Sequence, residues 1–357
     1  MPRKRKILLF SSEPGGAEVL IPVYRSLESS GHYDVTVLAR AYANDRFARA
    51  GVPHFDSGQI VRGQVGVLGE YEPEYAITSA TSIPEKDSSE TDFWANCRAY
   101  NVPTLAFLDQ WQNYLLRFYG KGPTDPSQLP DHINCINRIG EEEMLAEGFP
   151  AERLVLFGQP YLTSVIEQAK TLRPADIKQK LGLDKALRTS LFVSESLSEY
   201  YGKSLGFDQF DAAETFLRIV SRSNVDGIAL VKLHPKDNLK KFRYLEKKFP
   251  ALRIKFLQQE VTAVESIVMS DEIYGMTSIM LLEAFLLGRP VVSLQPNLKV
   301  ENRLVLSRYG YIRTVLREGD DATPFAVDKE RRREFKFHYD AEKLLGFLDH
   351  QLADQTM

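Results

Sequence analysis

A turn rich in small polar residues lies between an apolar strand and an apolar helix in Ser270–Leu294, which reads SDEIYGMTSIMLLEAFLLGRPVVSL. The turn is Gly275-Met276-Thr277-Ser278, and it brings backbone N–H groups and two hydroxyls to the start of the helix. The first N–H groups of a helix have no partner within it, and they lie at the positive end of its dipole. We therefore expect this turn to bind an anion.

A histidine flanked by two lysines ends an earlier strand, in VKLHPK. Pro235 restricts the preceding residue, His234, to extended backbone, and Lys232 and Lys236 add positive charge beside its ring. A phosphate is a natural ligand for such a cluster. The alternative is a histidine that only packs in the fold.

Two more carboxylates are expected near these turns. Glu283 stands alone among apolar residues in MLLEAF, where a carboxylate is costly unless it is paired or binds a ligand such as ribose hydroxyls. The alternative is a glutamate that faces solvent. Ser194 and Glu195 follow another apolar strand, in SESLSEY. Ligands bind at the carboxyl ends of strands in open α/β sheets, so these two residues are expected to line the same pocket.

Two glycines follow the first strand of the chain, in SSEPGGAEVLIPVYRSL. Gly15 and Gly16 allow a ligand close to the backbone where a helix begins, and Glu13 is a candidate catalytic base or a partner for a sugar hydroxyl. The sequence lacks the full G-x-G-x-x-G fingerprint of dinucleotide binding, so no nicotinamide or flavin cofactor is expected. Alternatively, the glycines only shape a turn.

Asp109 ends another apolar strand, in TLAFLDQWQNYLLRF, and is a candidate general base. Trp111 beside it suits stacking on a sugar or a base. Asn113 and Arg117 are four residues apart and would share one face of a helix. Alternatively, Asp109 only caps the helix and three aromatic residues are packing residues: Trp111, Tyr114 and Phe118.

Regularly alternating strands and helices must position these residues. The apolar runs are KILLF, DVTVLA, YAITSA, PTLAFLD, HINCIN and RLVLFG, followed by SLFVSES, GIALVKLH, LRIKFL, EIYG and PVVSL. Helix-length segments divide them, which is typical of parallel βαβ units. We predict two doubly wound, Rossmann-like α/β domains facing each other across a cleft. The predicted segments are an N-terminal domain (1–158), a helical connector (159–188), a second domain (189–325) and a C-terminal helical segment (326–357).

Composition limits the classes of function. The 357 residues include 45 Lys and Arg against 48 Asp and Glu, so the net charge of −3 argues against a nucleic-acid partner. Cys97 and Cys135 are too few for a disulfide framework and too isolated for a zinc site. No apolar stretch approaches the ~20 residues of a membrane helix. A cytoplasmic location is expected, with the basic run 3–6 either a solvated flank or a contact to anionic lipid.

The chain resembles the GT-B superfamily of nucleotide-sugar glycosyltransferases. It looks most like the branch with capsule-polysaccharide transferases and CDP-glycerol glycerophosphotransferases, whose relatives include the UDP-GlcNAc 2-epimerases. KLHPK is similar to the His-Pro element that contacts the nucleotide phosphate, and GMTSIMLLEAFLLGRPVV to the segment that holds the donor's phosphates and ribose. FGQPYL looks like the Gly-x-Pro segment that ends the first domain. Retaining members carry E-x7-E, but Gly275 stands where the first glutamate would be, which favours an inverting enzyme.

The predicted function is that of a metal-independent, inverting glycosyltransferase in surface polysaccharide or glycoconjugate biosynthesis. Its partners would be a nucleotide-activated sugar and a hydroxyl acceptor, with no cofactor besides the donor. Five residues of the second domain would hold the donor: Lys232, His234, Thr277, Ser278 and Glu283. Asp109 or Glu13 would deprotonate the acceptor. The alternatives are a nucleotide-sugar epimerase or hydrolase and a non-catalytic anion-binding protein.

Overall fold

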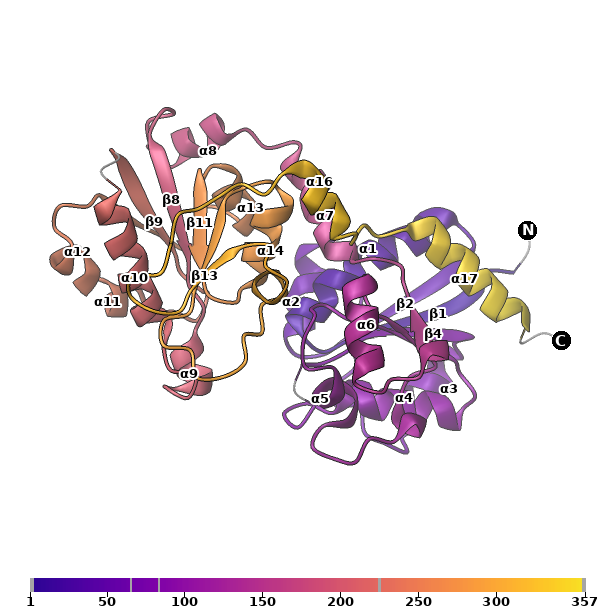
Figure 1. Cartoon of the computed structure of the whole chain (residues 1–357). Helices are drawn as coiled ribbons and strands as arrows, with labels where there is room; N and C mark the ends of the chain where they lie inside the picture. The colour runs from indigo at the N-terminus through magenta and orange to yellow at the C-terminus, as the bar shows by residue number, and fades with distance from the viewer. Residues whose placement is uncertain (1–2, 65, 83, 224–225, 355–357) are drawn as a thin grey trace. The chain divides into compact units, whose positions relative to one another are not determined.

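The computed structural model describes residues 3–64, 66–82, 84–223 and 226–354, and the chain divides into two compact α/β units (Figure 1). Unit 1 comprises Met1–Ser164 and Lys336–Met357, and unit 2 comprises Val165–Phe335. Each unit has its own parallel sheet with helices packed on it, so the prediction of two doubly wound α/β domains is confirmed.

In the described part of unit 1, the sheet has seven parallel strands in the order β3-β2-β1-β4-β5-β6-β7. The order reverses between β1 and β4, whose carboxyl ends are the expected place for a ligand in a doubly wound sheet. The strands are β1 (Arg5–Ser11), β2 (Tyr33–Ala39), β3 (Phe55–Asp56), β4 (Tyr75–Ser79), β5 (Thr104–Phe107), β6 (His132–Asn134) and β7 (Leu154–Val155).

The first helix of unit 1 shows how the sequence sets its elements. Pro14 occupies the first turn of α1, where a missing N–H costs nothing, and Gly31 ends the helix at a φ of 72°. The other helices of this unit are α2 (Tyr42–Arg49), α3 (Gly66–Tyr71), α4 (Ser89–Ala99), α5 (Tyr114–Tyr119) and α6 (Arg138–Ala146), with the short 3₁₀ helices Pro126–Gln128 and Ala151–Arg153. Helix α7 (Pro160–Ala169) crosses the boundary with unit 2.

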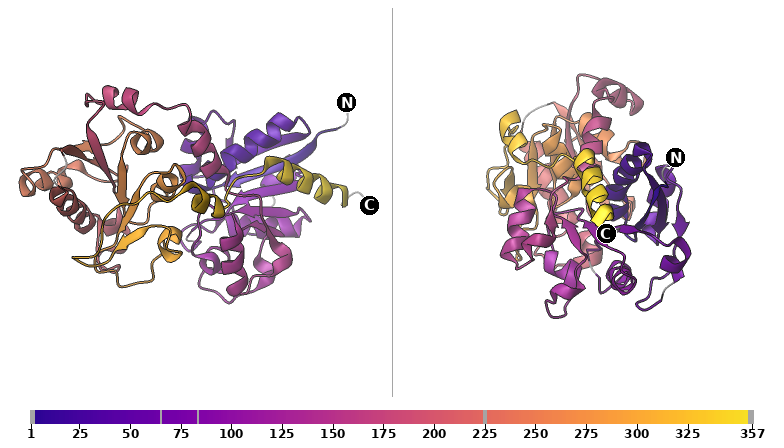
Figure 2. Two further views of the ribbon diagram at one scale, coloured as in Figure 1. Left: turned by 45° about the horizontal axis from the view of Figure 1, so that its top comes forward. Right: turned by 90° about the vertical axis from the view of Figure 1, so that its right-hand side faces the viewer.

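The C-terminal helix α17 (Ala341–Asp354) belongs to unit 1. Leu344, Leu348 and Leu352 lie in the hydrophobic core of that unit, and the helix packs against α1 (Figure 2). Their spacing of four residues puts them on one helix face. The sequence analysis treated 326–357 as a separate segment, whereas these leucines make its last part an element of unit 1.

In unit 2, the described sheet has six parallel strands in the order β10-β9-β8-β11-β12-β13, and the order reverses between β8 and β11. The strands are β8 (Arg188–Val193), β9 (Gly227–Lys232), β10 (Ile254–Leu257), β11 (Glu272–Gly275), β12 (Val291–Leu294) and β13 (Arg313–Val315). The helices are α8 (Pro174–Lys180), α9 (Leu197–Tyr201), α10 (Gln209–Arg222), α11 (Leu239–Phe242), α12 (Tyr244–Lys248), α13 (Ala263–Val268), α14 (Ile279–Leu286), α15 (Val305–Arg308) and α16 (Lys329–Glu334).

Across the residues that the structure describes, none of the helices is both long enough and apolar enough to span a bilayer.

Candidate functional site

Three polar turns meet at the carboxyl edge of the unit 2 sheet. Val193 of β8 is the register partner of Lys232 in β9 and of Gly275 in β11, so these strands end side by side. The turns that follow them carry Glu195, His234 and Thr277. The prediction that these segments line one edge of one sheet is therefore confirmed at the level of the strands.

The N–H groups at the start of α14 hold a carboxylate of the chain itself. Glu195 Oε1 accepts hydrogen bonds from the backbone N–H groups of Thr277 (2.6 Å) and Ser278 (2.8 Å), and Oε2 accepts one from the Thr277 hydroxyl (2.8 Å). Ser278 caps the helix, with its hydroxyl accepting from the N–H of Met280. Burial raises the pKa of Glu195, and the hydrogen bonds from Thr277 and Ser278 oppose that effect. The donors of this turn are thus bonded to a carboxylate of the chain, and their contact with a ligand phosphate remains a prediction.

His234 lies one strand away and is oriented by backbone and hydroxyl groups. Its Nδ1 accepts from the N–H of Lys236 (3.2 Å) and lies 3.0 Å from the Ser196 hydroxyl. A ring nitrogen that accepts a backbone N–H carries no proton, so the neutral ring has its proton on Nε2. Burial lowers the pKa of His234, although the nearby Asp237 carboxylate opposes this. The ring is therefore neutral at pH 7 and can donate one hydrogen bond from Nε2.

Asp237 organises this turn, and the sequence analysis missed it. Its Oδ2 accepts from the His234 N–H (3.0 Å) and from the Ser194 hydroxyl (2.6 Å), and its Oδ1 accepts from the Ser196 hydroxyl (3.2 Å). The available signal was its place three residues after His234, where an Asp side chain can bond the backbone of its own turn. Ser194 therefore supports the histidine turn, and nothing in the structure shows it facing a ligand.

Lys232 does not lie where a phosphate ligand needs it. Its ammonium group donates to the carbonyl of Gln258 and to that of Val261 (2.7 Å), so it ties the end of β9 to the loop after β10. Burial lowers its pKa. The predicted phosphate contact by Lys232 is wrong, because its side chain points to backbone carbonyls. Lys236 is exposed, and its phosphate contact remains a prediction.

Three other predicted residues of unit 2 are buried. Gly275 is a strand residue, and a Cβ there would lie 3.0 Å from Leu281, so the glycine serves close packing of α14 on β11. Met276 is completely buried and its carbonyl accepts from the Ser293 hydroxyl. Neither residue has a side chain that can contact a ligand, so any binding by Gly275 or Met276 would involve the backbone. Glu283 is also completely buried in α14, and its ribose contact remains a prediction.

In unit 1, Glu13 and the two glycines lie at the start of α1, after β1. Glu13 is half-buried, and its carboxylate accepts from the Thr81 hydroxyl (2.9 Å) and the Ser82 N–H (3.4 Å). A Cβ on Gly15 would lie 2.7 Å from Asp109 Oδ2, and one on Gly16 would lie 2.3 Å from the Ser79 Cβ. Packing against Ser79 therefore requires glycine at position 16, whereas the contact at Gly15 is with the end of the Asp109 side chain. The approach of a ligand to either glycine remains a prediction.

Asp109 is tied to a completely buried arginine. Arg117 Nη2 lies 2.8 Å from Asp109 Oδ1, and the same guanidinium donates to the carbonyls of Gln112 (2.9 Å) and Ala80 (2.6 Å). Arg117 has no exposed surface, so its predicted role as a ligand contact is wrong. It serves instead as the counter-ion of Asp109.

The segment after Asp109 is not helical where the sequence analysis assumed a helix. Helix α5 begins at Tyr114, and Asn113 precedes it in the left-handed region, at a φ of 59°. Asn113 and Arg117 therefore do not share a helix face. Trp111 is 2% exposed and its indole N–H donates to Asn137 (2.7 Å), so it is a packing residue and cannot stack on a sugar.

Glu90 is a buried acid that the sequence analysis missed. Its Oε1 accepts from the Ser12 N–H (3.1 Å), the Ser12 hydroxyl (2.8 Å) and the Ser79 hydroxyl (3.1 Å). Burial raises the pKa of Glu90 to about 7, and the nearby Glu13 carboxylate adds to that effect. The sequence offered no signal for it, because a glutamate in the first turn of a helix is usually solvated.

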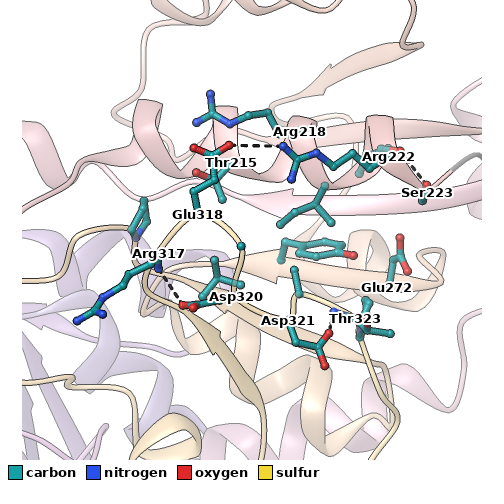
Figure 3. Close-up of a pocket in the computed structure, with 18 of the residues that line it drawn as sticks. Thr215, Arg218, Arg222, Ser223, Glu272, Arg317, Glu318, Asp320, Asp321 and Thr323 are labelled. Atoms are coloured by element: carbon teal, nitrogen blue, oxygen red, sulfur yellow. Dashed lines mark hydrogen bonds and ion pairs between the residues drawn. The ribbon is translucent and has the colours of Figure 1, made fainter.

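Unit 2 also has a pocket of ≈ 700 Å³ between α10 and the loop 316–324 (Figure 3). None of the predicted site residues lines it. Two ion pairs lie within its lining: Arg188 with Glu272 at 3.0 Å and Arg222 with Glu318 at 3.4 Å. The lining therefore carries both signs of charge.

The two units with six and seven parallel strands define the fold of GT-B enzymes, as the sequence resemblance implied. No family model and no curated protein matches the sequence. Among solved structures, the UDP-GlcNAc 2-epimerase of Methanocaldococcus jannaschii in complex with UDP-GlcNAc and UDP is similar, with a TM-score of 0.65 at 13% identity over 97% of this chain and 99% of that chain.

Two further structures have the same fold. The UDP-GlcNAc 2-epimerase of Neisseria meningitidis bound to UDP-GlcNAc gives a TM-score of 0.63 at 13% identity, over 87% of each chain. A glycosyltransferase of Rickettsia africae gives 0.57 at 10% identity, over 98% of this chain and 89% of that chain. At such identities the likeness establishes the fold.

Proposed function

We propose that this protein is an enzyme acting on a nucleotide-activated sugar, with the nucleotide diphosphate bound at the carboxyl edge of the unit 2 sheet. The observation that carries this is the anion site at Thr277 and Ser278, whose N–H groups already hold a carboxylate. Solved structures with this fold are described as bound to UDP-GlcNAc or UDP. A uridine nucleotide is therefore the first ligand to test.

In this proposal His234 and the start of α14 stabilise the charge that develops on the leaving nucleotide. A neutral His234 donates a hydrogen bond from Nε2 to a phosphate oxygen, and the N–H groups of Thr277 and Ser278 donate to another. Fixed donors of this kind stabilise a developing anion without reorganising during the reaction. We propose that they replace a metal ion in that role.

Two reactions fit this class, and each has its own support. Epimerisation of a UDP-sugar is favoured by the solved structures, since two of the three described above are UDP-GlcNAc 2-epimerases. Inverting sugar transfer is favoured by the acids of unit 1. Such a transfer needs a single base, and Glu13 is half-buried while Asp109 is bound to Arg117. In that case Glu13 deprotonates the acceptor hydroxyl.

Calorimetry with UDP, CMP, CDP and GDP tests the binding proposal. We expect UDP to bind, and His234→Ala to weaken binding about tenfold, because one hydrogen bond to a charged group is worth roughly 1.5 kcal/mol and alanine has no donor. The matched control is His32→Ala, at an exposed histidine of unit 1, which should leave the affinity unchanged. If none of the four nucleotides binds, the proposal fails.

Product analysis separates the two reactions. Turnover of UDP-GlcNAc alone to an epimer indicates an epimerase. A strict requirement for an added hydroxyl acceptor indicates a transferase, and Glu13→Gln should then abolish turnover while the affinity for UDP stays the same.

A further inference from the structure

The anion position of the unit 2 edge is filled by the chain itself. The two backbone N–H groups and the hydroxyl at Thr277 and Ser278 all donate to the Glu195 carboxylate. Each backbone N–H has one proton to donate, so a phosphate oxygen can be bound there only if the carboxylate leaves. Two anions side by side at this position would also repel each other.

We propose that Glu195 is an internal competitor, whose carboxylate occupies the phosphate position of the nucleotide site and must swing out before a diphosphate binds. This inference rests on the proposed function and concerns how the same site selects its ligand. The Glu195 carboxylate is held by no ion pair within the described residues; hydrogen bonds from the turn before α14 hold it. A ligand that replaces those bonds can displace it without leaving a buried cation behind.

The backbone around Glu195 is fixed, so the exchange is a rotation of one side chain. The Ser194 N–H donates to the carbonyl of Lys232 (2.9 Å), and the Ser194 and Ser196 hydroxyls both donate to Asp237. The carbonyl of Glu195 accepts from the Leu197 N–H (2.7 Å). The Asp237 that holds this loop also bonds the backbone of His234, so the Glu195 backbone and the histidine turn form one rigid edge.

Competition of this kind selects ligands by charge. A diphosphate offers more anionic oxygens than a carboxylate, so it can exchange three hydrogen bonds for at least as many and still reach His234. An uncharged nucleoside has nothing to offer the N–H groups and leaves Glu195 in place. The site therefore accepts nucleoside diphosphates and their sugar esters and discriminates against nucleosides.

The test is calorimetry of UDP, uridine and inorganic pyrophosphate with the wild-type protein and the Glu195→Ala variant. If the carboxylate is seated in about nine of ten free molecules, its removal lowers the apparent Kd for UDP and pyrophosphate about tenfold. The affinity for uridine should not change. Glu195→Gln keeps the shape of the side chain and loses its charge, so it should also raise the affinity for UDP and for pyrophosphate. It serves as the second variant if the alanine variant does not fold.

The matched control is Glu199→Ala. Glu199 lies in the same segment and pairs with Lys241 at 3.7 Å, but it does not contact the N–H groups of Thr277 and Ser278. Its removal changes the net charge equally and should leave the affinity for UDP within about twofold, because an exposed charge is screened.

The outcomes separate this inference from the proposed function. If the Glu195 variants bind pyrophosphate more tightly but no nucleotide binds to any of the proteins, the role of Glu195 as a competitor is supported and the proposed nucleotide-sugar function is overturned. Weaker binding of UDP in both Glu195 variants would overturn the competitor and show that Glu195 supports the ligand. An equal rise in the affinity for UDP in Glu199→Ala would also overturn the role of Glu195 as a competitor, because the effect would then come from the net charge.

Discussion

Both units place a carboxylate beside the start of a helix at the carboxyl edge of a sheet, but they hold it differently. In unit 1, Asp109 lies against Gly15 at the start of α1 and is paired with the completely buried Arg117. In unit 2, Glu195 is bonded to the N–H groups that open α14, with no ion pair among the residues that the structure describes.

This difference separates a structural carboxylate from an exchangeable one. Removing the partner of a buried charge is strongly destabilising, because the remaining ion loses both water and counter-charge. Asp109 therefore cannot move away without stranding Arg117. Backbone N–H groups donate to any anion of suitable shape, so Glu195 can be exchanged for another anion. This difference is why we place the proposed nucleotide site at the edge of unit 2, and why Glu13, which is not paired with Arg117, is the proposed base of unit 1.

The largest expected effect is the loss of stability when the ion pair of Asp109 and Arg117 in unit 1 is broken. Arg117→Met should destabilise the protein by about 3–5 kcal/mol, since it leaves Asp109 without its counter-ion and frees the carbonyls of Gln112 and Ala80. Urea unfolding followed by circular dichroism measures the change. The double variant Arg117→Met with Asp109→Asn should recover part of the loss, because no unpaired charge then remains.

Arg138→Met is the matched surface control for that experiment. Arg138 pairs with Glu141 at 2.7 Å and Glu142 at 3.0 Å, but its side chain is 70% exposed. Its removal should cost no more than about 1 kcal/mol. An equally small cost for Arg117→Met would show that Asp109 is as free to move as Glu195, and the two edges would not differ.

The next effect is a pH dependence at Glu90, the buried acid beneath Glu13. Its pKa is about 7 in the folded protein against an ordinary 4.5, so the folded state keeps a proton that the unfolded state has lost between these values. Its contribution to stability therefore falls as the pH rises through that window. The free energy of unfolding of Glu90→Gln, relative to that of the wild type, should therefore rise by about 2–3 kcal/mol between pH 5 and pH 8.

Urea unfolding of both proteins at the two pH values checks this. The side-chain amide introduced by Glu90→Gln can still accept from the Ser12 N–H, so the fold should survive the change. A difference between the two proteins that does not vary with pH would mean that Glu90 is ionised throughout, as an exposed acid is.

The sequence was sufficient to predict most of the strands and the polar turns at their ends. Apolar runs divided by helix-length segments predicted the alternation in both units, and two short strands were missed. Phe55–Asp56 and Arg313–Val315 have two and three residues, too few to show a periodicity, whereas the equally short β6 and β7 lie inside the longer runs HINCIN and RLVLFG. We expected Thr277, His234 and Glu195 at one edge because each follows the carboxyl end of a strand in the same parallel sheet.

The direction of individual side chains was not predictable. Lys232 and Arg117 stand beside candidate site residues in the sequence, yet both point to backbone carbonyls. Nor does local sequence show that Glu195 fills the site at Thr277, because the two are 82 residues apart and meet only through the sheet. Such pairings depend on tertiary packing, which spacing along one element does not determine.

A moderate effect is expected at Lys232, which tests whether every cation at the unit 2 edge serves the ligand. Lys232→Met should cost about 1–2 kcal/mol of stability, since it leaves the carbonyls of Gln258 and Val261 without a donor. The affinity for UDP should stay the same. A loss of affinity comparable to that of His234→Ala, measured by calorimetry, would place its ammonium group on the ligand instead.

The smallest effect is expected at Ser278, and it compares the start of α14 with an ordinary helix start. Ser278→Ala removes the hydroxyl that accepts from Met280 and should cost about 1 kcal/mol, as the loss of an N-cap generally does. Thr262→Ala removes the equivalent cap of α13, where the hydroxyl accepts from the Glu265 N–H, and should cost a similar amount.

Thermal melts with and without UDP distinguish the two variants. The stabilisation by UDP should shrink in the Ser278 variant, whose frayed first turn holds its N–H groups less well, and stay unchanged in the Thr262 variant. Equal stabilisation of both variants would mean that the first turn of α14 is no more than a helix start.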